Sequence, residues 1–84
     1  GTVILSVDRV PGGTSVLYSV GEPARVEIAA FDVSGRKLST LVSQDQTAGQ
    51  FRAVWKSSGQ PSGIYFYKLV AGDHEDIRKF VVRH

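Results

Sequence analysis

The chain has 84 residues, of which 42% are hydrophobic and 21% charged, with a net charge of +2 and no cysteine. A chain this short supports only one hydrophobic core, and its composition is that of a folded globular domain rather than a disordered segment. The lack of cysteine excludes disulfides and thiolate metal sites, and the basic residues, dispersed from Arg9 to Arg83, do not form the cluster that a nucleic-acid-binding groove needs.

The first part of the chain contains three predicted strands. Residues 3–10 form the first, and the sequence Pro11-Gly12-Gly13 that follows is incompatible with a helix or a central strand. Residues 14–20 and 24–31 alternate apolar and polar side chains, which is typical of half-buried strands.

A tight turn at residues 32–36, built from Asp, Ser and Gly, leads into a fourth predicted strand at 37–42. In this strand Leu38 and Leu41 lie three positions apart, which breaks strict alternation and predicts a β-bulge or a short helical turn. The polar residues 43–49 are expected to form a loop.

Three more strands are predicted in the remainder of the chain. The fifth covers residues 50–56 and places Trp55 on its inward face, and the sixth follows the turn-rich connector that ends at Gly63. A hairpin at residues 72–74 returns the chain to the seventh strand, at 76–83. The side of this last strand that faces the core is left open by the pattern.

Seven short strands with glycine-rich turns and no 3.6-residue periodicity predict an all-β domain of two antiparallel sheets packed face to face, with a small closed barrel as the rival architecture. No apolar run approaches the ~20 residues of a membrane span, so no span is expected. The predicted core consists of Val3, Leu5, Val7, Val16, Tyr18, Val20, Val26, Ile28, Ala30, Leu38, Leu41, Phe51, Trp55, Tyr65, Tyr67, Leu69 and Phe80.

No combination of residues in the chain indicates an active site. There is no persuasive nucleophile with a base and no acid pair, and residues 73–76, the one cluster of metal-capable side chains, fit a polar hairpin turn better than a metal site. We therefore expect no enzyme activity, no cofactor and no metal. Alternation places Phe31 and Phe66 on outward faces, where they could form an exposed patch for a glycan or a protein, unless a neighbouring loop covers them.

The order of these elements resembles the C-terminal sorting domain, type A, of bacterial type IX secretion cargo. The matching segments are Thr14–Val20, Val26–Arg36, Leu41–Val42, Ala48–Gln50, Val54–Trp55, Ser62–Leu69 and Arg78–Val82. The same pattern is similar to the immunoglobulin-like domain of flagellar hook-capping proteins and to sandwich modules at the ends of large secreted enzymes. The resemblance implies a seven-stranded antiparallel immunoglobulin-like β-sandwich.

For function, the resemblance implies a non-catalytic sorting module of a larger exported protein, which reaches the cell surface or the medium through the periplasm. Its partner is the secretion machinery. The recognised part is the final strand with its basic tail, Arg78, Lys79, Phe80, Val81, Val82 and Arg83. An edge strand of this kind can pair with a partner by backbone hydrogen bonds, although the same charges can simply solvate the edge.

A second hypothesis is a structural module that assembles with neighbouring domains. Within a single domain spanning residues 1–84, residues 1–10 form an arm, 11–13 a joint and 14–84 the body. The arm could leave its own domain and complete the sheet of a second copy. An accessory carbohydrate-binding module is a third. The first residue, Gly1, is not expected to be the native start.

Overall fold

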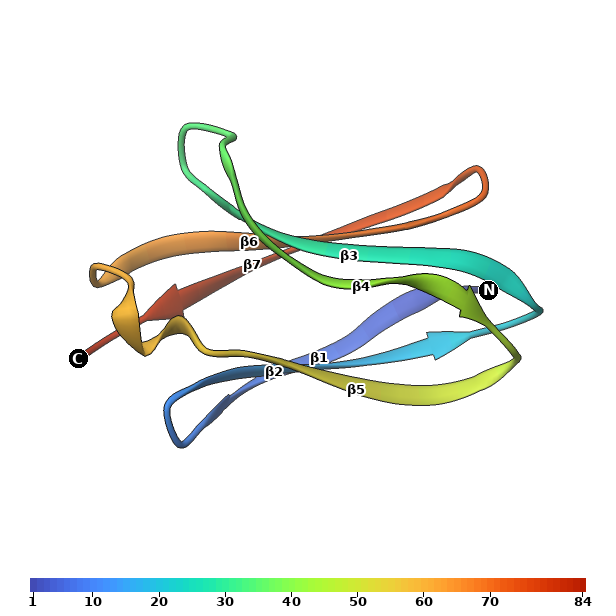
Figure 1. Ribbon diagram of the computed structural model, residues 1–84, viewed down its shortest axis with the longest axis horizontal. Helices are drawn as coiled ribbons and strands as arrows, with labels where there is room; N and C mark the ends of the chain where they lie inside the picture. The colour runs from blue at the N-terminus through green and yellow to red at the C-terminus, as the bar shows by residue number, and fades with distance from the viewer.

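The computed structural model describes residues 1–84 as seven strands and one short 3₁₀ helix, arranged in two antiparallel sheets that pack face to face (Figure 1). One sheet has the order β1-β2-β5 and the other the order β4-β3-β6-β7. The elements are β1 (Val3–Val10), β2 (Gly13–Val20), β3 (Ala24–Asp32), β4 (Lys37–Gln46), β5 (Gly49–Trp55), η1 (Ser57–Gly59), β6 (Gly63–Ala71) and β7 (His74–Val82).

This topology is an immunoglobulin-like β-sandwich, as expected. Unlike the constant-type immunoglobulin arrangement, the fourth strand pairs with the third and joins the larger sheet. No backbone ladder closes β1 onto β7 or β4 onto β5, so the rival closed barrel is excluded. The two termini lie toward opposite ends of the long axis (Figure 1).

Of the predicted joint at residues 11–13, Pro11 and Gly12 form a tight turn and Gly13 is the first residue of β2. Val10 pairs with Gly13, so that β1 folds back on β2 through a connection of only Pro11 and Gly12. Proline sets the φ angle of the first turn position, and Gly12 has a φ of +79°, which suits the second position of a type II turn. The N-terminal arm is thus the edge strand of its own sheet in this structure.

The expected bulge in the fourth strand is confirmed and accounts for both leucines. Along the β3–β4 ladder Ile28 pairs with Val42 and Ala29 with Thr40, which leaves Leu41 as an extra residue. A second shift two pairs later, where Ala30 pairs with Ser39 and Phe31 with Lys37, leaves Leu38 as an extra residue. Both side chains pack, partly buried, against the core. A three-residue leucine spacing here reflects two bulges rather than helix.

The expected loop at residues 43–49 is wrong. Strand β4 continues to Gln46, and the connection to β5 is only two residues long. The sequence in this segment is polar because β4 lies at the edge of the sheet. Residues 24–27 of β3 nevertheless provide backbone hydrogen-bonding partners for residues 43–46. Backbone pairing with β3 makes this segment a strand, although its side chains are polar.

The expected inward positions of Val3 and Leu5 in β1 are also wrong. Their side chains are 39% and 41% exposed, whereas Ile4 is 1% exposed and belongs to the core. The β1–β2 register skips Leu5, since Ile4 pairs with Tyr18 and Ser6 with Leu17. This bulge puts Ile4 and Val7 on the same face, three positions apart, and simple alternation cannot anticipate it.

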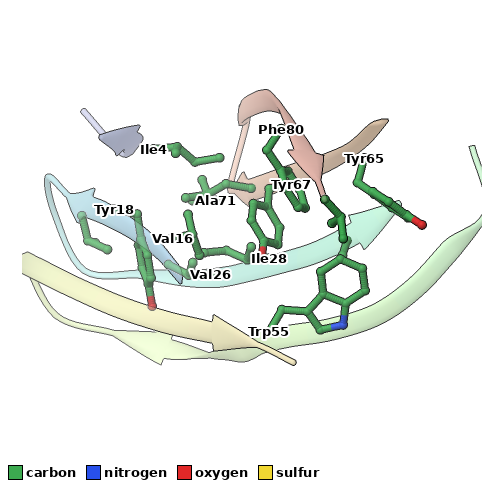
Figure 2. Close-up of a cluster of buried hydrophobic side chains, with 14 residues drawn as sticks. Ile4, Val16, Tyr18, Val26, Ile28, Trp55, Tyr65, Tyr67, Ala71 and Phe80 are labelled. Atoms are coloured by element: carbon green, nitrogen blue, oxygen red, sulfur yellow. The ribbon is translucent and has the colours of Figure 1, made fainter. Parts of the chain in front are cut away.

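The core lies between the two sheets and has an aromatic end (Figure 2). Trp55 meets the rings of Tyr65 and Phe80 edge to face, with centroids 5.8 and 6.2 Å apart, and Tyr67 stacks on Phe80 at 4.3 Å. Such pairs add about 0.5–1.5 kcal/mol each beyond burial. The buried cluster consists of Ile4, Val16, Tyr18, Val20, Val26, Ile28, Ala30, Trp55, Tyr65, Tyr67, Leu69, Ala71, Phe80 and Val82.

The inward tyrosines each have a partner for the hydroxyl group. The Tyr67 hydroxyl forms a hydrogen bond of 2.6 Å with Thr14 Oγ1, and the Tyr18 hydroxyl donates to Gln46 Oε1 at 2.9 Å. Desolvation by burial raises the pKa of both phenols, and the hydrogen bonds oppose that rise. No buried side-chain nitrogen or oxygen atom is left without a partner.

Candidate functional site

The predicted recognition strand is β7, which lies at the edge of the larger sheet and pairs only with β6. Its inward residues Phe80 and Val82 are buried in the core, which settles the facing that the sequence left open. Lys79 and Val81 face outward and are exposed, and Arg83 follows the end of the strand. Only part of the predicted segment is therefore available to a partner.

The N-terminal half of β7 uses charged side chains to hold the first strand. The Asp76 carboxylate accepts a hydrogen bond from the backbone N–H of Ile4 at 2.7 Å, and Arg78 Nη2 donates to the backbone carbonyl of Ile4 at 2.8 Å. These two contacts join the edges of the two sheets where no backbone ladder exists. Inward charges on an edge strand also discourage unwanted strand addition.

The acidic side chains of the hairpin at residues 73–76 contact different parts of the molecule. Asp76 binds β1, and Glu75 Oε2 lies 3.4 Å from Lys68 Nζ across the β6–β7 ladder. No group of three or more His, Cys, Asp or Glu side chains is positioned to hold a metal ion.

Alternation along each strand predicts outward positions for Phe31 and Phe66, and the register of the two strands places these residues side by side. The two residues are direct partners on β3 and β6, the central strands of the larger sheet (Figure 1). On the flanking strands, Lys37 of β4 is paired with Phe31 and Lys79 of β7 with Phe66. Paired residues share a face, so a Lys-Phe-Phe-Lys row crosses the outer face of the sheet. We call it the cross-strand row. Both phenylalanines are half-buried and both lysines exposed.

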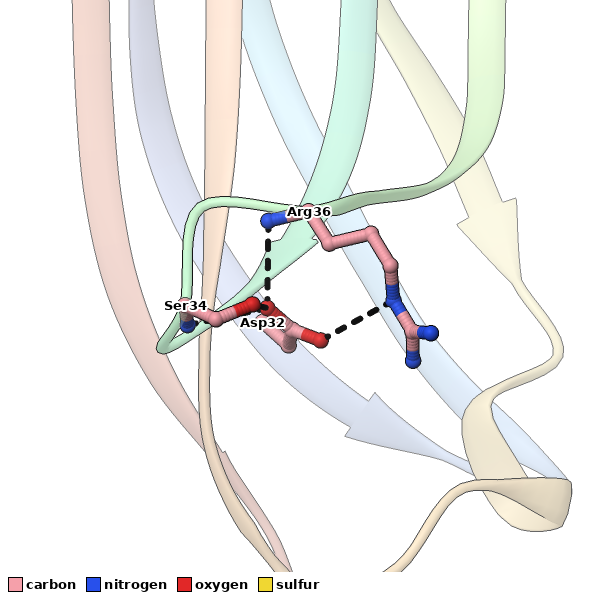
Figure 3. Close-up of polar contacts among 3 residues, drawn as sticks. All are labelled: Asp32, Ser34 and Arg36. Atoms are coloured by element: carbon pink, nitrogen blue, oxygen red, sulfur yellow. Dashed lines mark hydrogen bonds and ion pairs between the residues drawn. The ribbon is translucent and has the colours of Figure 1, made fainter.

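The turn that joins β3 to β4 lies next to the Lys37 end of the cross-strand row and is held by hydrogen bonds to Asp32 (Figure 3). Asp32 Oδ1 accepts hydrogen bonds from Ser34 Oγ at 2.6 Å and from the backbone N–H groups of Ser34 and Arg36, at 2.9 and 3.1 Å. The Arg36 guanidinium lies 3.4 Å from Asp32 Oδ2. The Ser34 hydroxyl, assisted by the backbone N–H groups and Arg36, lowers the pKa of Asp32 below its usual 3.8. The turn therefore fixes where β4 begins, and with it Lys37.

A second basic region lies at the end of the sandwich where β7 stops. A depression of about 160 Å³ there is bordered by the end of β1, the β1–β2 turn, η1 and the residues that follow β7. Its basic lining residues are Arg9 of β1 and, after β7, Arg83 and His84. His84 is held by two contacts, its backbone N–H to Ser62 Oγ at 3.2 Å and its Nε2 to the carbonyl of Gln60 at 2.6 Å. The C-terminal residue His84 is thus held against the β5–β6 connection.

No helix in the structure has the length and apolar character required to cross a bilayer. No family model matches the sequence, and comparison with curated proteins and with solved structures finds no significant match. The resemblance to sorting domains therefore stays a prediction from the sequence, and the structure contributes the fold and the placement of the residues.

Proposed function

We propose that the domain is a non-catalytic C-terminal sorting module of a larger exported bacterial protein, recognised by secretion machinery through β7. The observation that carries the proposal is the position of β7 at the edge of the larger sheet. An edge strand has unpaired backbone groups along one side, which a partner can engage by strand addition. Lys79, Val81 and Arg83 are exposed beside that edge, and the two basic residues, Lys79 and Arg83, provide positive charge for an acidic partner surface.

The contacts of Asp76 and Arg78 make the two halves of β7 differ in their accessibility to a partner. Their contacts with Ile4 hold the N-terminal half against β1, so that only the C-terminal half, from Lys79 onward, is accessible along the edge. A partner strand that pairs there leaves the core residues Phe80 and Val82 in place. Recognition of this kind requires no unfolding of the module.

The test is export of a reporter fused in front of residues 1–84 in a bacterium with a type IX secretion system. We expect the reporter at the cell surface or in the medium, and we expect Lys79→Ala with Arg83→Ala to reduce export. The matched control is Arg25→Ala with Lys56→Ala, which removes the same charge at exposed positions outside β7 and outside the depressions beside it. Periplasmic retention of the folded wild-type fusion would overturn the proposal, as would equal export by both double variants.

A second candidate function is self-assembly by exchange of β1. It is favoured by the two-residue β1–β2 turn, because short hinge loops favour domain swapping, and by the exposed apolar side chains of Val3 and Leu5. Sedimentation of the purified chain over a wide concentration range tests it. A dimer that persists on dilution is expected from exchange, and a monomer at every concentration excludes this function.

A further inference from the structure

We propose that the outer face of the β4-β3-β6-β7 sheet binds an acidic polysaccharide, a polymer of uronic acid units, along the cross-strand row. The outer face shares Lys79 with the β7 edge, but binding of a polysaccharide there does not depend on export. The row gives the face an aromatic centre, Phe31 and Phe66, and a cation on each side, Lys37 and Lys79. The four strands follow one another across the sheet in this order.

The two cations of the row have no carboxylate partner. The only ion pairs in the structure are Arg36 with Asp32 and Lys68 with Glu75, so neither Lys37 nor Lys79 is neutralised. Neighbouring strands are spaced by about 4.8 Å, which places these two lysine backbones ~14 Å apart, three strand spacings. A polymer lying across the strands meets the two lysines in succession, with the phenylalanines between them.

A depression beside the row adds a place for one sugar unit. It has a volume of about 170 Å³ and is lined by Glu27, Ala29, Phe31, Lys37, Lys68 and Val70. Its smallest lining side chain, Ala29, is only 7% exposed even though it faces outward, because larger neighbours surround it. The apolar face of a pyranose ring fits against Phe31 and Val70, while the unpaired Lys37 meets a carboxylate at its edge.

Glu27 gives the depression one hydrogen-bond acceptor, which favours a ligand with hydroxyl groups. Its carboxylate accepts hydrogen bonds only, and in the structure it receives one long bond of 3.5 Å from the Ser43 hydroxyl. The hydroxyl groups of a uronic acid can donate to it. A polyglutamate segment has no hydroxyl groups and can donate to Glu27 only through its backbone N–H groups. The combination of unpaired lysines, aromatic rings and one carboxylate therefore favours a ligand that is both anionic and rich in hydroxyl groups.

The probe is oligogalacturonate, titrated into the 84-residue domain by calorimetry and followed by the NMR shifts of residues on the larger sheet. Neutral galacto-oligosaccharide and poly-L-glutamate are the comparison ligands. We expect binding to oligogalacturonate only, weakened by added salt, with shifts centred on the cross-strand row. Absence of binding at low salt would overturn the proposal, and equal binding of poly-L-glutamate would show a purely electrostatic surface and also overturn it.

The affinities of single variants distinguish binding at the cross-strand row from attraction to the overall positive charge of the protein. Lys37→Ala and Lys79→Ala are exposed changes that should each weaken binding about three- to fivefold, and the double variant by ~10-fold. Lys56→Ala removes the same charge from the other side of the molecule and should leave affinity unchanged. Phe66→Leu keeps an apolar side chain at the half-buried position and should weaken binding about fivefold by removing the stacking surface. If Lys56→Ala weakens binding as much as Lys79→Ala does, the proposed site is excluded.

Discussion

The carboxylate of Asp76 in β7 accepts the backbone N–H of Ile4 in β1 at 2.7 Å, across 72 positions of sequence. Arg78 completes the contact by donating to the carbonyl of the same residue at 2.8 Å. One residue of the first strand is thus bound through both of its backbone groups by side chains of the last strand. The sandwich is closed on this side by polar side chains in place of a ladder.

Replacing Asp76 should therefore destabilise the domain more than its partly exposed position suggests. Asp76→Ala leaves the Ile4 N–H without its partner, at a cost of about 1–3 kcal/mol in the free energy of unfolding. Asp76→Asn keeps an acceptor oxygen and should lose less. Urea unfolding measures both, with Asp73→Ala in the adjacent exposed turn as the control. Equal stability of Asp76→Ala and Asp73→Ala would show that the Ile4 contact contributes nothing.

The buried hydroxyl pair of Thr14 and Tyr67 should behave as a unit. Thr14→Val leaves the Tyr67 hydroxyl without a partner and should cost about 1–3 kcal/mol, whereas Thr14→Ser keeps the hydrogen bond. The double variant Thr14→Val with Tyr67→Phe removes both polar groups and should recover part of the loss. A thermodynamic cycle from chemical denaturation gives the coupling, and additive single effects would contradict the prediction.

The raised pKa of Tyr67 predicts a loss of stability at alkaline pH. Its phenol is harder to ionise in the folded state, so the contribution is fully present below the unfolded value of 10.0 and is lost as pH rises through the folded pKa. Thermal unfolding of the wild type and of Tyr67→Phe across this range measures the effect. The phenylalanine variant should lose less stability than the wild type above pH 10.0. Parallel curves for the two proteins would refute it.

The Asp32 turn predicts the opposite dependence, at acidic pH. The lowered folded-state pKa means that the contribution of Asp32 is present above the unfolded value of 3.8 and is lost as the pH falls through the folded value. Because the Ser34 hydroxyl is the largest cause, Ser34→Ala should raise the pKa of Asp32 toward 3.8. NMR titration of the Asp32 carboxyl carbon measures this directly. An unchanged titration in the variant would assign the shift to another group.

Two glycines in the β1–β2 hairpin should differ in their tolerance of alanine. A methyl group at Gly13 would collide with the backbone carbonyl of Trp55, so Gly13→Ala should cost about 3 kcal/mol or more. Gly12→Ala meets open space but retains a φ of +79°, and about 1 kcal/mol is expected. Gly59→Ala, with no neighbour within 4 Å, is the control. Similar midpoints for the variants at Gly13 and Gly59 in chemical unfolding would contradict a close approach of β5 to Gly13.

The sequence by itself determined the strands, most of the turns and the inward faces of β2, β3, β5 and β6. These features are local: a period of two places Trp55 and Tyr67 inward, and Asp32 carries its own turn chemistry in the next four residues. Tertiary structure decided the rest. The bulge at Leu5, the extension of β4 and the inward facing of Asp76 depend on a partner strand elsewhere in the chain.

The candidate binding surface also depends partly on local sequence and partly on tertiary structure. Alternation predicts that Phe31 and Phe66 face outward, but only the register of three strand pairs places them side by side between Lys37 and Lys79. Register is a property of two strands at once, set by the fit of their buried faces, and a shift of one residue would move either side chain to the opposite face. No pattern within one strand contains that information.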